Sequence, residues 1–453
     1  MIFLKRKRLI IWLFKAYIKK WRKTIFLSFL FGLIVFFVLK YGVNYFIPLM
    51  PFTYRESIGM VGAYTSDNLP PEILFKLSTG LTRVDKDNNV LPSLANSWEI
   101  KNDGKKYIFY LKKNLYFSDG KKLTSSEIQY NFLDVKVERP NEYTIVFNLK
   151  NKYSPFLVTV SKPVFKKNFV GVGNFRVVSV NLNGNFVQSI NLVSAKAGTK
   201  ELSYQFYPTE EALKTAFVLG EVSKITGVKN IKFANTNLSK FPNANVVKKI
   251  DYAQLVTLFY NTKDKNLSDK KLRDALSYTI PNTFSQGQRN NTPFNPNSWA
   301  GKNGLAIRQQ DLDRARLLLK DSVSSTQSAS FEIEIKTLPQ YKDLAEDVQG
   351  YWQEIGVKSK IKTADALPDT FQVFLGEFNV PKDPDQYSLW HSSHENNITN
   401  YKNLRIDKLL EDGRQTLDIS ERKKIYSDFQ KYLLDDPPAI FLYFPYVYEI
   451  TRK

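Results

Sequence analysis

Residues 91–133, LPSLANSWEIKNDGKKYIFYLKKNLYFSDGKKLTSSEIQYNFL, decide the fold of this chain. Apolar and polar residues alternate on both sides of an Asn-Asp-Gly turn at 102–104, and an Asp-Gly pair readily adopts the positive φ angles of a tight turn. The first half of the stretch therefore predicts a β-hairpin. In the second half Thr124 precedes Glu127 at capping-box spacing, in which the two side chains satisfy free backbone N–H groups of a first helical turn. We expect a helix to begin there.

The same stretch carries a resemblance to a known family. The matching segments are LANSWE at 94–99, DG at 103–104, YIF at 107–109, LK at 111–112, FSDG at 117–120 and LT at 123–124. In this order they resemble the hallmark run of the family 5 extracellular solute-binding proteins, the peptide, nickel and related receptors of ABC importers. Later segments resemble the same family, with two glycines kept in GVGNF at 171–175 and Ser223 standing where the family usually has Asp.

The resemblance implies an α/β fold of the two-lobed, type II periplasmic-binding-protein kind with a small extra domain. The residues support it independently, because strand, helix and strand patterns alternate over 331–361 and favour a partly parallel sheet. We expect lobe 1 at 57–85 and 171–250, and the small hairpin-containing domain at 86–170. Lobe 2 is expected at 251–453, with a short or missing return to lobe 1.

Composition excludes several kinds of function. The 453 residues include no Cys, which excludes disulfides, thiolate metal sites, Cys nucleophiles and the lipid-bearing Cys that tethers many bacterial binding proteins. The net charge is +21, but residues 1–23 hold nine Lys or Arg and no acid, which leaves +12 for the rest. A charge spread so thinly indicates a Lys-rich solvated surface, and no nucleic-acid partner is expected.

The N-terminal region predicts a membrane anchor. A basic cytoplasmic segment at 1–23 precedes an apolar run at 24–47, and a linker at 48–56 follows. The positive-inside rule then places the protein in the cytoplasmic membrane as a single-pass protein with its C-terminal part outside the cell membrane. A cleaved signal peptide shares the basic-then-apolar order and is the competing interpretation. No Ala-x-Ala-like site follows the apolar run, which favours an uncleaved anchor.

The chemistry-bearing residues do not predict an enzyme. His391 and His394 stand beside Glu395, but their spacing differs from that of the known helical zinc motifs, so a polar loop is favoured and no metal or cofactor is expected. Neither a Gly-rich phosphate loop nor a Gly-x-Ser-x-Gly elbow occurs. Asp383 and Asp385 flank Pro384 in what we call the Asp-Pro-Asp turn (residues 383–385), without an independent catalytic partner.

Ligand-binding residues are expected where the two lobes face each other, because a two-lobed receptor must bind its ligand more tightly in the closed state. The end of the first strand and the residues that bracket the Asp-Pro-Asp turn supply the candidates. They are Tyr64, Thr65, Phe378, Asn379, Trp390 and His391. Asn379 can bond peptide-like amides, and the aromatic rings offer flat apolar area. Packing in the core is the alternative for each aromatic ring.

At one position this sequence differs from the peptide receptors in a way that argues against assigning their ligand to this chain. In those receptors an Asp just upstream of the "DP" element pairs with the α-amino group of the peptide, and here that position is Val380. A buried ammonium group without a counter-charge is costly. Glu377 and Asp383 are the two acids that could substitute, and the sequence leaves this open.

The leading hypothesis is a non-catalytic extracytoplasmic receptor that binds peptides or a similar small solute between its lobes. It would deliver the solute to an ABC permease, and the N-terminal helix would hold it at the membrane. The alternative from another class is a surface-anchored adhesin or polyanion-binding protein that uses the basic, aromatic-rich exterior. Steep loss of binding with added salt would favour the alternative.

Overall fold

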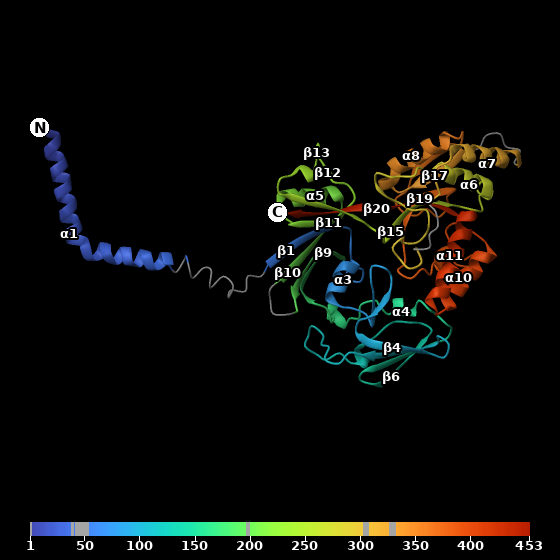
Figure 1. The fold of residues 1–453 in the computed structure, drawn as a ribbon, viewed down its shortest axis with the longest axis horizontal. Coiled ribbons are helices and arrows are strands. Elements are labelled where there is room, and N and C mark those ends of the chain that lie inside the picture. Colours follow the sequence, from blue (N-terminus) through green and yellow to red (C-terminus); the bar gives the residue numbers. More distant parts are fainter. Residues whose placement is uncertain (1, 38–39, 41–53, 196–199, 302–307, 326–331) are drawn as a thin grey trace. The chain divides into compact units, whose positions relative to one another are not determined.

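The structure is a computed structural model, and it describes residues 2–37, 40, 54–195, 200–301, 308–325 and 332–453 (Figure 1). Contacts divide the chain into two units, which are described separately. The smaller comprises Met1–Arg55 and Lys196–Glu201, and the larger comprises Glu56–Ala195 and Leu202–Lys453.

The smaller unit contains one long helix, α1 (Ile2–Phe37). Its apolar side chains from residue 25 onward, such as Phe26 and Phe29, are exposed. Of the helices in the described residues, none is both long enough and apolar enough to cross a membrane. Residues 38–39 and 41–47 of the predicted anchor and 48–53 of the predicted linker lie outside the described residues.

The larger unit contains a sheet that joins twelve strands of the described residues in the order β18-β17-β19-β15-β20-β11-β1-β10-β9-β8, with β14 and β16 paired to β20. The strands of its first half are β1 (Tyr54–Val61), β8 (Phe175–Asn183), β9 (Phe186–Ser194), β10 (Lys200–Tyr207), β11 (Lys224–Val228) and β14 (Ala244–Ile250). Those of its second half are β15 (Gln254–Tyr260), β16 (Gly287–Arg289), β17 (Glu332–Thr337), β18 (Lys358–Thr363) and β19 (Val373–Asn379).

The last strand, β20 (Ala439–Arg452), belongs to both halves (Figure 1). Its first residues pair with β15, from Ala439 opposite Phe259 to Tyr443 opposite Val256. Its last residues pair antiparallel with β14 and β11. The sequence predicts a short or missing return to lobe 1. In the structure, strand β20 makes the return to the first half. The domain boundaries themselves stay predictions.

Two connections run side by side between the halves. The chain passes from β14 to β15 through residues 251–253, and the Asp251 N–H donates a hydrogen bond of 2.9 Å to the carbonyl of Pro445 in β20. The Tyr252 ring packs edge-on against Phe444, with centroids 5.2 Å apart. The two connections therefore pass between the halves of the sheet at adjacent positions.

The second half of the sheet is covered on both faces. In β15, Leu255 and Phe259 belong to one core cluster, while Val256, Leu258 and Tyr260 belong to the other. A strand that is buried on both faces reads as a continuous apolar run, which explains the pattern of this segment. The covering helices are α6 (Lys270–Tyr278), α7 (Leu312–Ser325), α8 (Lys342–Gln353), α9 (Tyr387–Trp390), α10 (Leu404–Gln415) and α11 (Ile419–Asp435).

The predicted strand-helix-strand unit is confirmed. Strands β17 and β18 pair in parallel, with Ile335 opposite Ile361, and α8 lies between them in the sequence. The helix buries Leu344, Val348 and Trp352 against the sheet. The apolar stripe of this helix, read at a spacing of three to four residues, is therefore its core-facing side.

The first half carries α3 (Pro71–Leu77) and α5 (Glu210–Leu219). The predicted glycine bend at 171–175 lies against the end of α3, where a Cβ on Gly171 or Gly173 would come within 2.2 Å of a backbone oxygen. The Gly173 N–H donates a hydrogen bond of 2.8 Å to the Leu77 carbonyl. Glycine is required here because two backbones touch, not because of an unusual φ angle.

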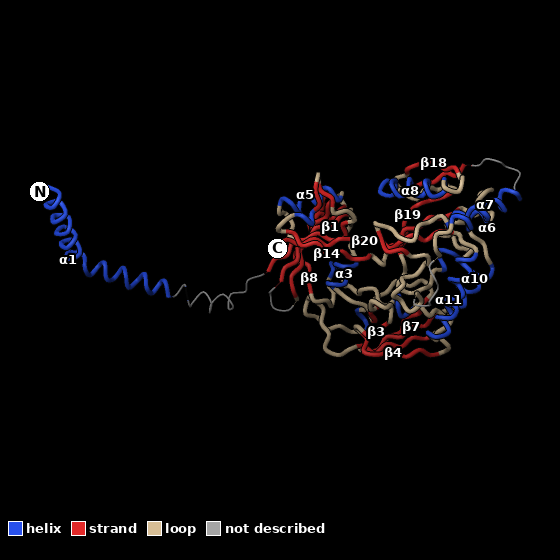
Figure 2. Tube along the Cα trace, turned by 45° about the horizontal axis from the view of Figure 1, so that its top comes forward, coloured by secondary structure: helices blue, strands red, loops and turns tan. Residues whose placement is uncertain are grey.

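A separate four-stranded antiparallel sheet, which we call the small sheet, has the order β4-β5-β7-β6 (Figures 1 and 2). Its strands are β4 (Ala95–Lys101), β5 (Lys106–Leu111), β6 (Val135–Asn141) and β7 (Thr144–Leu149). The predicted hairpin is confirmed, with Trp98 opposite Phe109 and with Gly104 at φ +80° in the turn. The remaining short elements are β2 (Thr82–Val84), β3 (Val90–Pro92), α4 (Phe156–Thr159), β12 (Lys232–Phe233) and β13 (Thr236–Asn237).

The prediction that a helix begins at Thr124 is wrong. The structure has a single 3-10 turn, Ser125–Glu127, and the Thr124 hydroxyl bonds the Ser126 hydroxyl at 2.8 Å instead of capping the backbone. The next apolar residues, Ile128, Tyr130 and Phe132, alternate with exposed ones and pack into the core of the small sheet. Burial of every second residue requires an extended chain. The residues after the capping-box pair therefore do not continue as a helix.

Candidate functional site

The Asp-Pro-Asp turn is fixed by a buried ion pair. Arg422 of α11 donates two hydrogen bonds to Asp383, of 2.7 Å to Oδ1 and 3.1 Å to Oδ2, and both side chains are less than one-tenth exposed. The Nε of Arg422 donates to the Gly413 carbonyl at 2.9 Å. The forked contact therefore ties the turn to α10 and α11 in one orientation.

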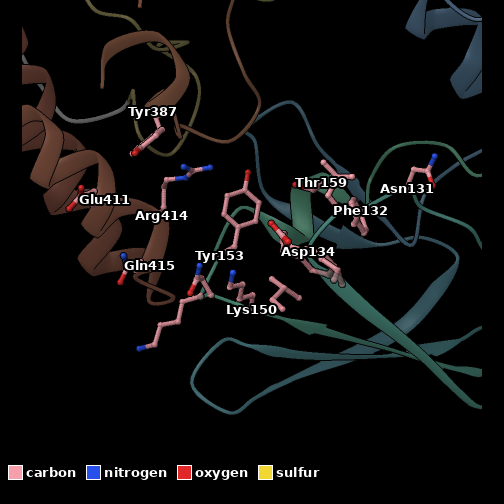
Figure 3. A pocket seen from close by; sticks show the side chains of 16 residues that line it. Asn131, Phe132, Asp134, Lys150, Tyr153, Thr159, Tyr387, Glu411, Arg414 and Gln415 are labelled. Carbon is pink, nitrogen blue, oxygen red and sulfur yellow. The ribbon is translucent and has the colours of Figure 1, made fainter. Parts of the chain in front are cut away.

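The second acid of the turn faces Arg414, in the last turn of α10. The Nε of Arg414 lies 3.0 Å from Oδ2 of Asp385, and the other carboxylate oxygen accepts the Tyr387 N–H at 3.2 Å. Burial raises the pKa of Asp385, and Arg414 opposes this shift. The guanidinium of Arg414 lies 4.4 Å from the ring centre of Tyr387 and 5.1 Å from that of Tyr153, so that it is held between two aromatic rings (Figure 3).

A cavity of about 890 Å³ opens between these helices and the loops of the small sheet (Figure 3). It is lined by Asn131, Phe132, Leu133, Asp134, Val135, Leu149, Lys150, Asn151, Lys152, Tyr153, Phe156, Thr159, Tyr387, Glu411, Arg414 and Gln415. Its two walls are joined at Ser154, whose N–H donates to the Arg414 carbonyl at 2.7 Å and whose hydroxyl donates to the Gly413 carbonyl at 3.2 Å. A volume of this size suits a small solute.

Two of the six predicted ligand residues lie in the core. Trp390 is 1% exposed and donates from Nε1 to Gln386 Oε1 at 2.7 Å, and its ring meets that of Phe378 edge-on at 6.4 Å. Phe378 is also buried. This burial favours core packing, the alternative that the sequence left open. A direct ligand contact by either ring stays a prediction.

His391 lies directly behind the cavity. Its ring stacks on Tyr387 with centroids 4.0 Å apart, and its Nε2 is 3.4 Å from Oε1 of Glu411. His394 packs edge-on against the same tyrosine at 6.0 Å. Across the described ranges, no group of three His, Cys, Asp or Glu side chains is placed to hold a metal ion.

The other three predicted residues lie away from the lining of the cavity. Tyr64 packs on Phe206 at 4.9 Å and donates its hydroxyl to the Val61 carbonyl at 3.2 Å. Thr65 is half-buried in the turn that follows. Asn379 is exposed at the end of β19, where its side-chain oxygen accepts a hydrogen bond from Gln254. Their roles as ligand contacts stay predictions.

The acids that could replace the missing Asp at Val380 are both engaged. Val380 packs at the edge of the core. Glu377 accepts hydrogen bonds from the Tyr341 hydroxyl and from Lys229, the latter at 3.2 Å. Asp383 is held in the buried fork with Arg422. Both carboxylates therefore already accept hydrogen bonds from protein groups.

Three residues that shape the cavity were missed by the sequence reasoning. Tyr153 was noted only as part of a family-like segment, and Tyr387 lies one helical turn before His391, a spacing that could have indicated a shared face. Arg414 gives no signal, because it is one of three cations in a charged helix. Its position between two rings follows from tertiary packing alone.

A sheet whose halves share one strand, a small separate sheet and a cavity sized for a small solute together define a two-lobed solute-binding protein. The family model described as bacterial extracellular solute-binding proteins, family 5 Middle, matches residues 89–400. The chain belongs to the family 5 extracellular solute-binding proteins, and the resemblance carried by residues 91–133 is confirmed.

Individual relatives agree with this assignment. The oligopeptide-binding protein AppA of Bacillus subtilis is 23% identical, and the match covers 84% of this chain and 83% of AppA. The structure of the substrate-binding protein CtaP of Listeria monocytogenes matches with a TM-score of 0.75 at 21% identity, over 88% of this chain and 94% of CtaP. NikZ of Campylobacter jejuni, in complex with Ni(L-His), gives 0.72 at 23% identity with the same coverage. These structures confirm the predicted two-lobed fold.

The burial of Trp390 makes a testable prediction. Trp390→Ala should lower the free energy of unfolding by about 3–5 kcal/mol in urea denaturation, because it removes a fully packed ring and leaves a cavity. The matched control is Phe186→Ala, since Phe186 is half-exposed on β9 and should change stability little. A Trp390→Ala protein of normal stability that has lost solute affinity would show that the ring serves the ligand instead.

Proposed function

We propose that this chain is an extracytoplasmic receptor that binds a small solute in the cavity between the small sheet and helices α9 and α10 and delivers it to an ABC permease. The observation that carries the proposal is the family match over residues 89–400, which includes most of the residues lining the cavity. Family 5 members are solute-binding proteins, and the proposed role is binding without catalysis.

The solute is proposed to be a peptide or a similar small molecule. AppA is an oligopeptide-binding protein, and NikZ is in complex with a nickel–histidine chelate, so both kinds of ligand deserve a test. The lining of the cavity supports an amphipathic solute, because it includes aromatic rings such as Tyr153 and Phe132 as well as charged groups such as Arg414 and Lys150.

Because the small domain is inserted in the sequence between the two parts of the first half, binding is proposed to bring the first half and the small sheet together toward the second half, which would close the cavity between the small sheet and helices α9 and α10. The movement is proposed to take place between the predicted domains, with lobe 1 at 57–85 and 171–250, the small domain at 86–170 and lobe 2 at 251–453. In the part of the chain that the structure describes, the backbone passes between the two halves at residues 251–253 and again at Pro445, and these two places are adjacent. A pair of adjacent crossings is a suitable hinge, because few backbone angles must change.

Ligand binding should appear as thermal stabilisation. Screening tri- to pentapeptides, nickel–histidine, haem and oligosaccharides should find at least one class that raises Tm, since a ligand at 100 times its Kd adds about 2.7 kcal/mol of stability. The shift should change little between low and high salt. A matched pair checks the site: Tyr153→Ala should lose the shift, while Tyr116→Ala, at an exposed tyrosine of the same part of the chain, should keep it.

Two outcomes would contradict the proposal. One is a shift that survives in Tyr153→Ala, which would place the solute elsewhere. The other is stabilisation only by polyanions with steep loss at high salt, which would favour the adhesin or polyanion-binding alternative.

The receptor is proposed to be held at the outer face of the cytoplasmic membrane by residues 24–47, with residues 1–23 in the cytoplasm. The basic side chains from Lys15 to Lys23 precede the exposed apolar side chains of α1, and this order supports insertion with the basic end inside. The absence of Cys supports a protein tether rather than a lipid one.

Mass spectrometry of the full chain recovered from membranes tests the anchor. We expect the protein in the membrane fraction with an N-terminus that still includes residues 24–47. A mature N-terminus after residue 47, with the protein released in soluble form, would show that the segment is a cleaved signal peptide.

A further inference from the structure

A second, much smaller cavity lies among the helices and strands of the second half. Its volume is about 20 Å³, which is room for one group the size of a water molecule. Its lining comes from α6, α11, the end of β16, the segment before α7 and the start of β20. The lining residues are Ser277, Arg289, Asn291, Arg308, Leu434, Pro437, Ala439, Ile440 and Phe441, and none of them lines the larger cavity.

Arg289, the last residue of β16, has hydrogen-bond donors without a protein acceptor. Its Nη1 donates to the carbonyls of Asn290, Phe441 and Leu442, the last at 2.9 Å. Neither Nη2 nor the buried Nε donates to an acceptor in the part of the chain that the structure describes. The Nε–H and one N–H of Nη2 lie parallel on one edge of the guanidinium, so this edge can bond a single acceptor with both donors.

Among the described residues, no acid lies at ion-pair distance from Arg289. The lining of the small cavity includes two arginines but neither Asp nor Glu. Asp274 is paired with Arg308 at 3.0 Å, and residues 302–307, which precede Arg308 in the sequence, contain no acid. Burial and the nearby Arg308 lower the pKa of Arg289 to about 10. The guanidinium is therefore still charged at neutral pH, but its charge is destabilised.

The backbone carbonyls at the end of α11 and before β20 already accept hydrogen bonds from other arginines. The Leu434 carbonyl accepts from Nη2 of Arg308 at 2.7 Å, and the Pro437 carbonyl accepts from Nε of Arg273 at 2.9 Å. A cation that is removed from water without a counter-charge and without acceptors for its donors is costly. A water molecule would supply an acceptor only, whereas an anion of similar size would supply both the acceptor and the charge.

We propose that a monatomic anion such as chloride binds in the small cavity, between Arg289 and Arg308. It accepts hydrogen bonds from the free edge of Arg289 and offsets the charge of that guanidinium, since Asp274 already matches Arg308. The volume leaves no room for a solute that carries a carboxylate or a phosphate. The bound ion holds the start of β20 against α6 and β16. The proposal is independent of the receptor function, because the two cavities share no lining residue.

Titration of the purified full chain with chloride tests the proposal. Sodium gluconate, whose anion is too large for the cavity, is replaced stepwise by sodium chloride at constant ionic strength. The Tm should rise with chloride and then saturate, because an ion that binds the folded chain alone stabilises it. Bromide should act in the same way. The nuclear magnetic resonance line of chloride should broaden when the protein is added, which detects the bound ion directly.

Two variants and a matched control locate the effect. Arg289→Lys keeps a positive charge but loses the parallel donors, so the chloride concentration at half-saturation should rise roughly 10- to 100-fold. Asn291→Asp places a carboxylate in the lining, where it replaces the ion, so this protein should melt at the same temperature in gluconate and in chloride. Arg405→Lys should keep the wild-type dependence on chloride, because Arg405 is exposed and stacks on Tyr432 outside both cavities.

Two results would overturn the proposal. One is a wild-type protein whose Tm is the same in gluconate and chloride and which does not broaden the chloride line. The other is an undiminished dependence on chloride in both Arg289→Lys and Asn291→Asp, which would place the anion elsewhere on the basic surface. Melting curves in gluconate check that each variant is folded, and the wild-type titration is decisive even where a variant is not.

Discussion

Strand β20 is the constraint on which the larger unit depends, because it pairs with β15 in the second half of the large sheet and with β14 and β11 in the first. The switch occurs at Pro445, which has no N–H to donate, next to the connection at residues 251–253. Backbone hydrogen bonds hold each part of β20 to its own half. Relative movement of the halves must then bend this strand, and it can do so at the one residue with no N–H for the ladder.

The site depends on two charged side chains that are buried beside the second half of the large sheet. Burying Asp383 and Arg422 costs solvation free energy that only a well-aligned pair can offset, and the forked contact meets that condition. The pair sets the direction of the Asp-Pro-Asp turn, which in turn places Asp385 and Tyr387 beside Arg414. A rigid turn of this kind can hold a binding group in place before the ligand arrives.

Much of the fold could be predicted from the sequence, because local signals and the resemblance agreed. The hairpin with its turn at 102–104 and the parallel unit around α8 both have short-range causes. The helix at Thr124 was predicted wrongly, since the cap signal is local whereas the alternating burial of Ile128, Tyr130 and Phe132 is set by the small sheet. The cavity could be predicted only in part: His391 lies behind it, but Arg414 is placed by the meeting of α10 with the small sheet, which no spacing in the sequence encodes.

A ligand that closes the two halves should do so about the crossing of β20. The chain has no native Cys, so single cysteines can be introduced for spin labels at exposed Leu219 on α5 and Leu317 on α7, one on each half. Pulsed electron–electron double resonance should show a shorter and narrower distance distribution between these labels when a stabilising solute is added. A control pair within the second half, at Leu317 and Leu404, should not change. If the distance distribution between the labels at positions 219 and 317 stays the same at saturating solute, the two halves do not close on the ligand.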